Sequence, residues 1–480
     1  MLQRSLYKNR CPGTSIPGRA GRTGSAGPGA AGRQNRARSP ERPRYACRVR
    51  PPPRPNDRFR PGGAASRRSV AHLSQVERPS LHEPVLAGVV TAIVGFTSSF
   101  AVVLAGLRAT GASPDQASSG LLALTVVVGL GIILLALRYR VPVTLSWSTP
   151  GAALLAGASV PSGGWPAAVG AFLVTGVLFA LTGAVPWLGR LVARIPQHLA
   201  QAMLAGVLLP LCLAPFRSLG SIPELVLPVI LVWLAASALA PRWAVPLALV
   251  AALVVIGVQL RLQGTVIDPA SLLPHPSPTV PVLEPGALIG LALPLYVVTM
   301  ASQNLPGVAV LSSFGYRTPW RPALLVTGVG TAVVAPFGGH AVNLAALSAA
   351  LAAGEGAGAD RERRWIAALT AGCSYLVLAG ISGALVVVVG SAPAGLVEAV
   401  AGLALIGTMA TAVTASFRDA SGRMSGAVTF LLAASGLTIL GIGGAFWALV
   451  GGLLVRLTLE RTAVTRTPRG PATRGSAAEG

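Results

Sequence analysis

The fold is decided at Ala335-Pro336-Phe337-Gly338-Gly339-His340-Ala341-Val342-Asn343, which is followed by the mostly apolar run Leu344–Ala352. Proline and glycine disfavour a continuous helix, and the imidazole and the amide need hydrogen-bond partners. The stretch therefore predicts an extended segment followed by a short helix that begins near His340 or Asn343. Such a helix would point free N–H groups and the positive end of its dipole into the interior of an apolar protein.

A related stretch stands earlier in the chain, at Val141-Pro142-Val143-Thr144-Leu145-Ser146-Trp147-Ser148-Thr149-Pro150-Gly151. When the two stretches are aligned with an offset of 194 positions, Pro142 corresponds to Pro336, Ser146 to His340 and Thr149 to Asn343. A pair of apolar segments interrupted by Gly and Pro, at corresponding places in two halves of a chain, is typical of a transporter binding site.

The composition indicates a polytopic membrane protein embedded in the lipid bilayer. The chain has 480 residues, of which 52% are hydrophobic and 11% charged, against about 25% charged residues in a soluble domain. The net charge of +23 arises mainly from residues 1–80, which hold 18 Lys/Arg and 3 Asp/Glu. Residues 81–480 hold 20 basic and 12 acidic residues, so nucleic-acid binding is not indicated.

Fourteen apolar blocks of membrane-spanning length follow Ser80. They lie at 84–107, 117–137, 143–160, 165–188, 197–216, 223–240, 243–260, 286–312, 321–335, 338–353, 365–389, 393–413, 424–440 and 443–459. With a cytoplasmic N-terminus, the inner loops carry twelve arginines and the outer loops three. This distribution follows the positive-inside rule and places both termini in the cytoplasm.

The blocks divide into two sets of seven, and an odd number makes the second set enter the membrane from the opposite side. The predicted fold class is therefore an all-α polytopic membrane protein with inverted repeats and alternating access about a midplane site. The expected divisions are a disordered arm (1–80), a first repeat (81–260), a Pro-rich external linker (261–285), a second repeat (286–460) and a disordered tail (461–480).

Two clusters of neutral polar residues interrupt the first block of each repeat, Thr97–Ser99 and Thr299–Asn304. Such residues either bind a polar ligand or hold helices together. We interpret Thr97–Ser99 as helix contacts, and Gln303 and Asn304 as ligand contacts because they stand beside Pro306.

The two broken blocks supply the remaining candidates for an anion site, because two half-helix N-termini can hold an anion without a buried arginine. Ser, Thr and Asn at these places also serve as ordinary helix caps, and the two roles are compatible. The candidates on these blocks are Ser146, Ser148, Thr149, Gly151, Gly339, His340 and Asn343. Trp147 either stacks on an aromatic ring or fills space.

Two ionisable residues are candidates for proton coupling. His340 is on the candidate ligand segment and titrates near neutrality. Glu398 lies in the twelfth block, where a buried carboxyl group could carry a proton; the alternative is an ordinary carboxylate near a helix start, shortly after Pro393. The chain carries no motif of an enzyme, of a metal centre or of a nucleotide-driven pump, so we expect no cofactor and no metal.

Residues 81–460 resemble the benzoate/proton symporter (BenE) family, which is related to uracil/xanthine permeases and sulfate-type anion transporters. The resemblance is carried by Leu145–Leu154, Thr299–Gly307 and Ala335–Leu344, with Arg194–Gln197 and Gly444–Trp447 in support. It implies core and gate domains, with short strands in the third and tenth segments before the half-helices that frame the substrate. The related nucleobase carriers place acidic residues in segments eight and ten, whereas this chain has Gln303, Asn304, His340 and Asn343 there.

The resemblance predicts proton-coupled import of benzoate or a similar aromatic carboxylate across the inner membrane, by a protein that is not an enzyme. The expected partners are this carboxylate, protons, lipid and a second copy in a homodimer. The alternatives are a nucleobase or inorganic-anion permease of the same fold and, from another class, a channel or membrane sensor.

Overall fold

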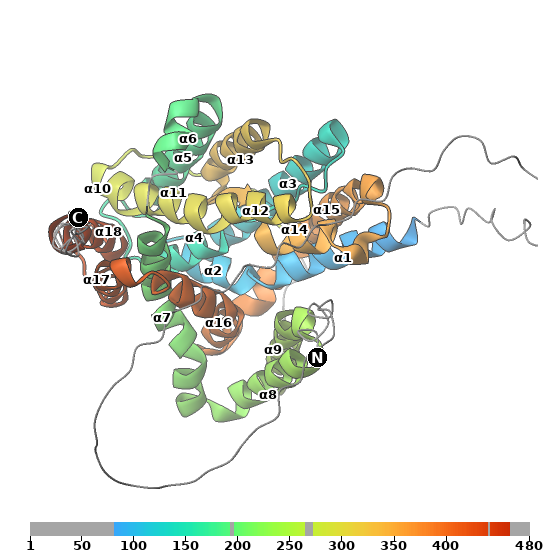
Figure 1. The fold of residues 1–480 in the computed structure, drawn as a ribbon. Helices are drawn as coiled ribbons and strands as arrows, with labels where there is room; N and C mark the ends of the chain where they lie inside the picture. The colour runs from blue at the N-terminus through green and yellow to red at the C-terminus, as the bar shows by residue number, and fades with distance from the viewer. Residues whose placement is uncertain (1–80, 193–195, 265–271, 440–441, 461–480) are drawn as a thin grey trace, which may run out of the picture. The chain divides into compact units, whose positions relative to one another are not determined.

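The computed structural model describes residues 81–192, 196–264, 272–439 and 442–460. The predicted arm (1–80), the predicted tail (461–480) and part of the linker lie outside the described residues. The described part is almost entirely helical (Figure 1), as the sequence predicts.

The first half of the chain contains nine α-helices and one strand among its described residues. In order, these are α1 (His82–Thr97), α2 (Phe100–Ala109), α3 (Pro114–Tyr139), β1 (Leu145–Trp147), α4 (Thr149–Ala156), α5 (Gly164–Ala184), α6 (Pro186–Val192), α7 (Gln197–Ser221), α8 (Pro223–Leu239) and α9 (Ala244–Leu262).

The second half is more interrupted among its described residues. Its main elements are α10 (Pro285–Ala287), the π-helix η3 (Leu288–Ala292), α11 (Leu293–Thr299), the π-helix η4 (Met300–Asn304), α12 (Leu305–Ser313), α13 (Trp320–Val334), β2 (Val342–Leu344), α14 (Ala346–Ala353), α15 (Trp365–Gly390), α16 (Leu396–Ser416), α17 (Arg423–Ala434), α18 (Gly444–Val455) and the π-helix η9 (Arg456–Glu460). Short 3-10 turns, among them η5 (Ala335–Phe337), join these elements.

Nine helical stretches in the described ranges are long and apolar enough to cross a membrane, and α8 is a shorter apolar helix. The polar clusters of the two first blocks fall at breaks in such stretches. The Thr97 hydroxyl donates to the Ile93 carbonyl and α1 ends there, while α2 begins after Ser99. Gln303 and Asn304 end η4. Fourteen membrane segments remain a prediction, because the two broken segments, α17 and α18 are too short to qualify by length alone.

The two halves are joined by a two-stranded antiparallel sheet. Strand β1 pairs with β2 in the register Leu145–Leu344, Ser146–Asn343 and Trp147–Val342. Two further hydrogen bonds extend the ladder at its ends, from Ser148 N to Ala341 O and from Ala345 N to Thr144 O, both 3.0 Å. Short strands in the third and tenth segments are therefore confirmed.

The predicted start of the second half-helix is wrong, because α14 begins at Ala346 rather than near His340 or Asn343. Pro336 belongs to the 3-10 turn that ends α13, and Gly338 then reverses the chain with a φ of 94°. The backbone of Val342–Leu344 is used by the ladder, so a helix can begin only after it. The corresponding elements β1 and β2, and α4 and α14, are offset by 197 positions rather than 194.

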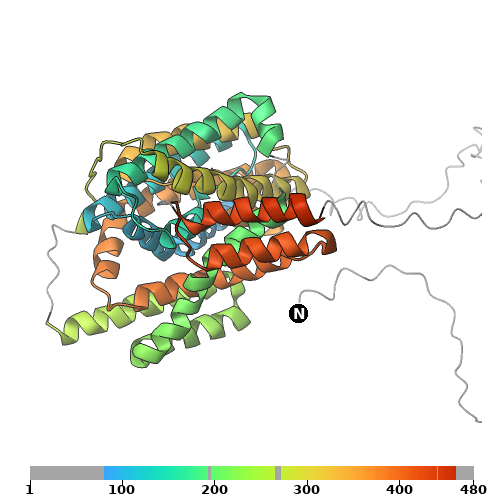
Figure 2. The ribbon, with the colours of Figure 1, turned by 90° about the vertical axis from the view of Figure 1, so that its left-hand side faces the viewer.

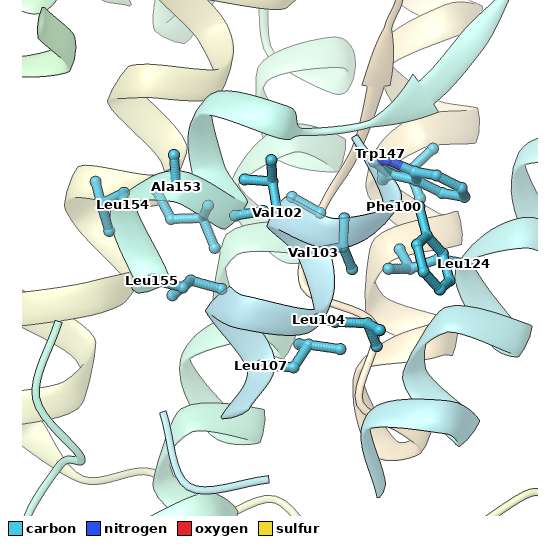
Figure 3. Close-up of a cluster of buried hydrophobic side chains, with 14 of the residues drawn as sticks. Phe100, Val102, Val103, Leu104, Leu107, Leu124, Trp147, Ala153, Leu154 and Leu155 are labelled. Atoms are coloured by element: carbon cyan, nitrogen blue, oxygen red, sulfur yellow. The ribbon is translucent and has the colours of Figure 1, made fainter. Parts of the chain in front are cut away.

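The interior is closely packed between helices that are distant in sequence. Where α2, α4 and β1 meet, the side chains of Phe100, Leu104, Leu107 and Trp147 are buried (Figure 3). A Cβ atom on Gly106 would collide with the Ala152 carbonyl, so α2 and α4 approach backbone to backbone. Close approach matters in a membrane, where helix association depends on packing rather than on the hydrophobic effect.

Helix pairs are arranged in two groups. Helices α3 and α15, α5 and α13, and α1 and α15 pack together, and α2 and α4 lie among them. The second group comprises α7, α8, α9, α16, α17 and α18, in which α8 pairs with α9 and α17 with α18 (Figures 1 and 2). The first group carries both broken segments.

Candidate functional site

The two half-helices begin at opposite ends of the β1–β2 ladder. Each starts within two residues of the end of its strand, α4 at Thr149 and α14 at Ala346. Because the strands are antiparallel, the helices leave the ladder in opposite directions. Their N-termini, which carry free N–H groups and partial positive charge, therefore flank one short sheet.

The N-terminus of α4 is capped by its own chain. The Ser148 hydroxyl accepts a hydrogen bond from Gly151 N at 3.0 Å and lies 2.7 Å from the Thr299 hydroxyl of α11. The side chain of Ser148 is fully buried. Helix α11 is thus in direct contact with the first half-helix.

His340 reaches across to the same cap. Its Nε2 lies 3.0 Å from the Ser148 carbonyl oxygen, and the imidazole is fully buried. A carbonyl oxygen only accepts hydrogen bonds, so Nε2 carries the hydrogen and neutral Nδ1 is an acceptor. Nδ1 has no hydrogen-bond partner in the described structure.

The N-terminus of α14 has no side-chain cap, because its N-cap residue is Ala345. Asn304 supports the strand in front of it: the amide oxygen accepts from Leu344 N at 2.9 Å. Asn343 donates through Nδ2 to Leu344 O at 2.8 Å, while its Oδ1 is buried without a partner in the described structure. Both amides are fully buried. The two half-helices therefore differ: one is self-capped and the other is open.

Trp147 packs against neighbouring side chains beside the ladder, which decides whether it stacks on an aromatic ligand or fills space. Its Nε1 donates to the Ser99 hydroxyl at 2.7 Å, and its ring packs edge-on against Phe96 and Tyr375. The ring is 1% exposed. Trp147 therefore fills the interior, and the Thr97–Ser99 break supplies its hydrogen-bond acceptor.

The other predicted residues lie as follows. Ser146 is half-buried on β1 opposite Asn343, and Thr149 is half-buried at the start of α4. Gly151 and Gly339 are buried, and Gln303 is half-buried on η4. The predicted alignment of Ser146 with His340 is wrong, because Ser146 corresponds to Asn343.

Glu398 lies away from this cluster. It is exposed in the first turn of α16, where its carboxylate accepts a hydrogen bond from Gly395 N at 3.0 Å. This arrangement is a helix cap, which was the alternative interpretation of this residue.

Three residues of the cluster were not selected from the sequence. Thr299 contacts Ser148, the Thr331 hydroxyl accepts from Val342 N at 2.9 Å, and the buried Tyr375 hydroxyl has no partner in the described structure. Thr299 stood within a predicted polar cluster, so it could have been chosen. Thr331 and Tyr375 lie within regular apolar helices and gave no signal.

Paired half-helices that meet at a sheet inside an apolar helical protein are typical of membrane transporters. The chain covers 97% of the transmembrane domain of the cyanobacterial bicarbonate transporter BicA, at 17% identity and a TM-score of 0.52 over 78% of this chain. It covers 68% of the structure of SLC26A9, at 12% identity and a TM-score of 0.58 over 82% of this chain. These similarities identify the fold.

Residues 79–458 match the family of benzoate membrane transport proteins, BenE, and the chain belongs to this family. It is 38% identical over 370 residues to the inner membrane protein YdcO of Escherichia coli, covering 76% of this chain and 93% of the relative. It is 28% identical over 377 residues to a benzoate membrane transport protein of Acinetobacter baylyi, covering 78% of this chain and 94% of the relative. The chain is therefore a membrane transporter of the BenE family.

Proposed function

We propose that this protein imports benzoate, or a similar aromatic carboxylate, together with protons by alternating access across the inner membrane. The observation that carries the proposal is the open, uncapped N-terminus of α14 beside a buried cluster of neutral polar groups. A carboxylate fits N–H donors at a helix N-terminus. Family membership and the benzoate transporter of Acinetobacter baylyi support the choice of substrate.

Two inverted repeats of seven segments (81–260 and 286–460), joined by the linker 261–285, are part of this proposal. Two equivalent hydrogen bonds support it, from Ser148 N to Ala341 O and from Ala345 N to Thr144 O. With the offset of 197 positions, Ser148 corresponds to Ala345 and Thr144 to Ala341, so each bond is the counterpart of the other. Helix packing supports it as well: α3 with α15 corresponds to α13 with α5, and α17 with α18 corresponds to α8 with α9. Inverted repeats allow one fixed site to be exposed to either side in turn.

The core domain would consist of segments one to four and eight to eleven, and the gate domain of the other six. The substrate carboxylate would lie between Ser148–Gly151 and His340–Asn343, nearer to α14 because Ser148 already occupies one donor of α4. Gln303 and Asn304 would contact it from segment eight, and the aromatic ring would lie against apolar gate residues. Ser146, Thr149 and Gly339 would line the same space.

His340 is the residue that we assign to proton coupling. Its free Nδ1 can accept a proton while Nε2 keeps its bond to the Ser148 carbonyl. The imidazolium would then bring positive charge to the start of α4 as the anion binds. Glu398 is a weaker candidate, because its carboxylate is exposed and caps α16.

Uptake of labelled benzoate into proteoliposomes, with and without an inward proton gradient, tests the proposal. We expect accumulation only with the gradient. Uptake that does not depend on the gradient would refute proton coupling, and absence of uptake would refute benzoate as the substrate. Competition by uracil, sulfate or bicarbonate would favour a nucleobase or inorganic-anion permease, and saturable counterflow would exclude a channel.

His340→Gln separates binding from coupling. The glutamine Nε2 can still donate to Ser148 O but cannot be protonated. We expect normal benzoate counterflow without proton-driven accumulation, whereas His340→Ala and Asn343→Ala should impair transport itself. Normal proton-driven accumulation by His340→Gln would show that the proton travels elsewhere.

A further inference from the structure

Arg364 binds the far end of the half-helix α14. Its guanidinium donates from Nη1 to Ala353 O at 2.7 Å and from Nε to Gly358 O at 2.8 Å. Ala353 is the last residue of α14, and the arginine is only 5% exposed. A buried cation thus lies against the negative end of the dipole of α14.

In the described part of the chain, no arginine donates a hydrogen bond to the end of α4. Gly157, which follows α4, lines a small cavity with the apolar residues Val207 and Pro210. The N-terminus of α4 is capped by Ser148, whereas that of α14 is open. While His340 is neutral, both differences make the N-terminus of α14 more positive than that of α4.

We infer that Arg364 is a positioning residue that gives α14 its preference for the negatively charged end of the substrate. The inference rests on the proposed function. The partial negative charge at a helix C-terminus opposes the attraction of an anion to the N-terminus, and it opposes it most in a short helix. Arg364 neutralises that charge and also fixes the position of α14 through two hydrogen bonds.

The other charged side chains near this end lie at the surface. Glu355 follows α14 by two residues, the Glu83 carboxylate is beside Gly358, and Asp360 pairs with Arg363 at 3.6 Å. These side chains and those of Arg361 and Glu362 are all exposed, so water and salt screen them more than they screen Arg364.

The size of the effect follows from the length of the helix. Eight residues at about 1.5 Å each separate Arg364 from a bound carboxylate by roughly 12 Å. At an effective dielectric constant of about 20 to 40, loss of one charge at this distance corresponds to a three- to tenfold weaker binding of an anion.

The test compares Arg364→Gln, which loses the charge, with Arg364→Lys, which keeps it, in benzoate uptake by proteoliposomes. We expect Arg364→Gln to raise KM about three- to tenfold at unchanged kcat, and Arg364→Lys to stay within about twofold of the unmodified protein. Arg363→Gln, which removes the neighbouring exposed charge, is the matched control and should leave KM unchanged.

An unchanged KM in Arg364→Gln, or an equal rise in both variants, would overturn the inference. If Arg364→Gln does not fold, the Arg364→Lys variant tests the inference. A normal KM with lower thermal stability would support the effect of the charge, and a raised KM would refute it. If the unmodified protein does not transport benzoate, the proposed function itself is refuted, and the role of Arg364 is then not what has failed.

Discussion

Asn304→Asp is the substitution that tests the proposed anion site most directly. The native amide oxygen accepts a hydrogen bond from Leu344 N at 2.9 Å, and the side chain is fully buried. An aspartate has nearly the same shape and keeps this acceptor, so β2 should remain in place. What changes is a carboxylate that accepts from Leu344 N, the residue before the N-cap of α14, where this N–H and the positive end of the helix dipole favour the ionised form.

The expected loss of affinity follows from Coulomb's law. A substrate carboxylate at the start of α14 would lie roughly 6 Å from the new carboxylate, a repulsion of about 3 kcal/mol at an effective dielectric constant of about 20. This energy corresponds to an approximately hundredfold rise in KM. Asn304→Leu should behave differently, because it leaves Leu344 N buried without an acceptor and costs about 1–3 kcal/mol of stability.

The assay is benzoate uptake in proteoliposomes at pH 7, with thermal unfolding of the purified variants measured alongside. Ser313→Asp is the control for an added charge, because Ser313 is exposed at the far end of α12. An Asn304→Asp protein that folds normally and keeps its KM would refute the placement of the carboxylate at α14.

Three other substitutions examine the same region and its surroundings. Ala345→Asp supplies α14 with a tethered carboxylate cap, so benzoate binding should weaken at least about tenfold in the folded protein, which thermal unfolding identifies because Ala345 is buried; unchanged binding would contradict the open N-terminus as the anion site. Thr331→Val leaves Val342 N without its acceptor and should cost about 1–3 kcal/mol, seen as a lower thermal midpoint. The backbone N–H groups of Ala287 and Gly286 lower the pKa of Glu284, so its contribution to stability is present above the unfolded pKa and is lost as the pH falls through the folded one. Thermal unfolding of Glu284→Gln should lack this acid-side loss, and an unaltered pH profile would contradict it.

The broken segments could be predicted because proline, glycine and buried polar residues interrupt an apolar pattern at the same place in both halves. The sequence therefore selected His340, Asn343 and Asn304, which the structure places at or beside the β1–β2 ladder. Their register was wrong by three positions, because Pro336 resembles Pro142 in sequence but ends a helix in the structure. Turn geometry at Gly338 decides this, and one sequence does not reveal it.

The contacts between halves could not be predicted, because they depend on how helices pack. Neither the bond of His340 to Ser148, 192 positions away, nor that of Arg364 to Ala353 follows from local sequence. Arg364 looked like one of several inner arginines, and only its burial distinguishes it. The count of fourteen segments rests on the sequence alone, because the short elements cannot be recognised by length.

The pairing of β1 with β2 has a consequence for how the protein is made. When the first half has been synthesised, the backbone of Leu145–Trp147 still lacks its only described strand partner, and unpaired backbone groups are costly in an apolar interior. Its partner β2 is translated much later, since the paired residues, such as Trp147 and Val342, are more than 190 positions apart. The backbone of Leu145–Trp147 can therefore complete its hydrogen bonds only after Val342–Leu344 has been made, and a chain truncated before Val342 lacks the partner of its central strand.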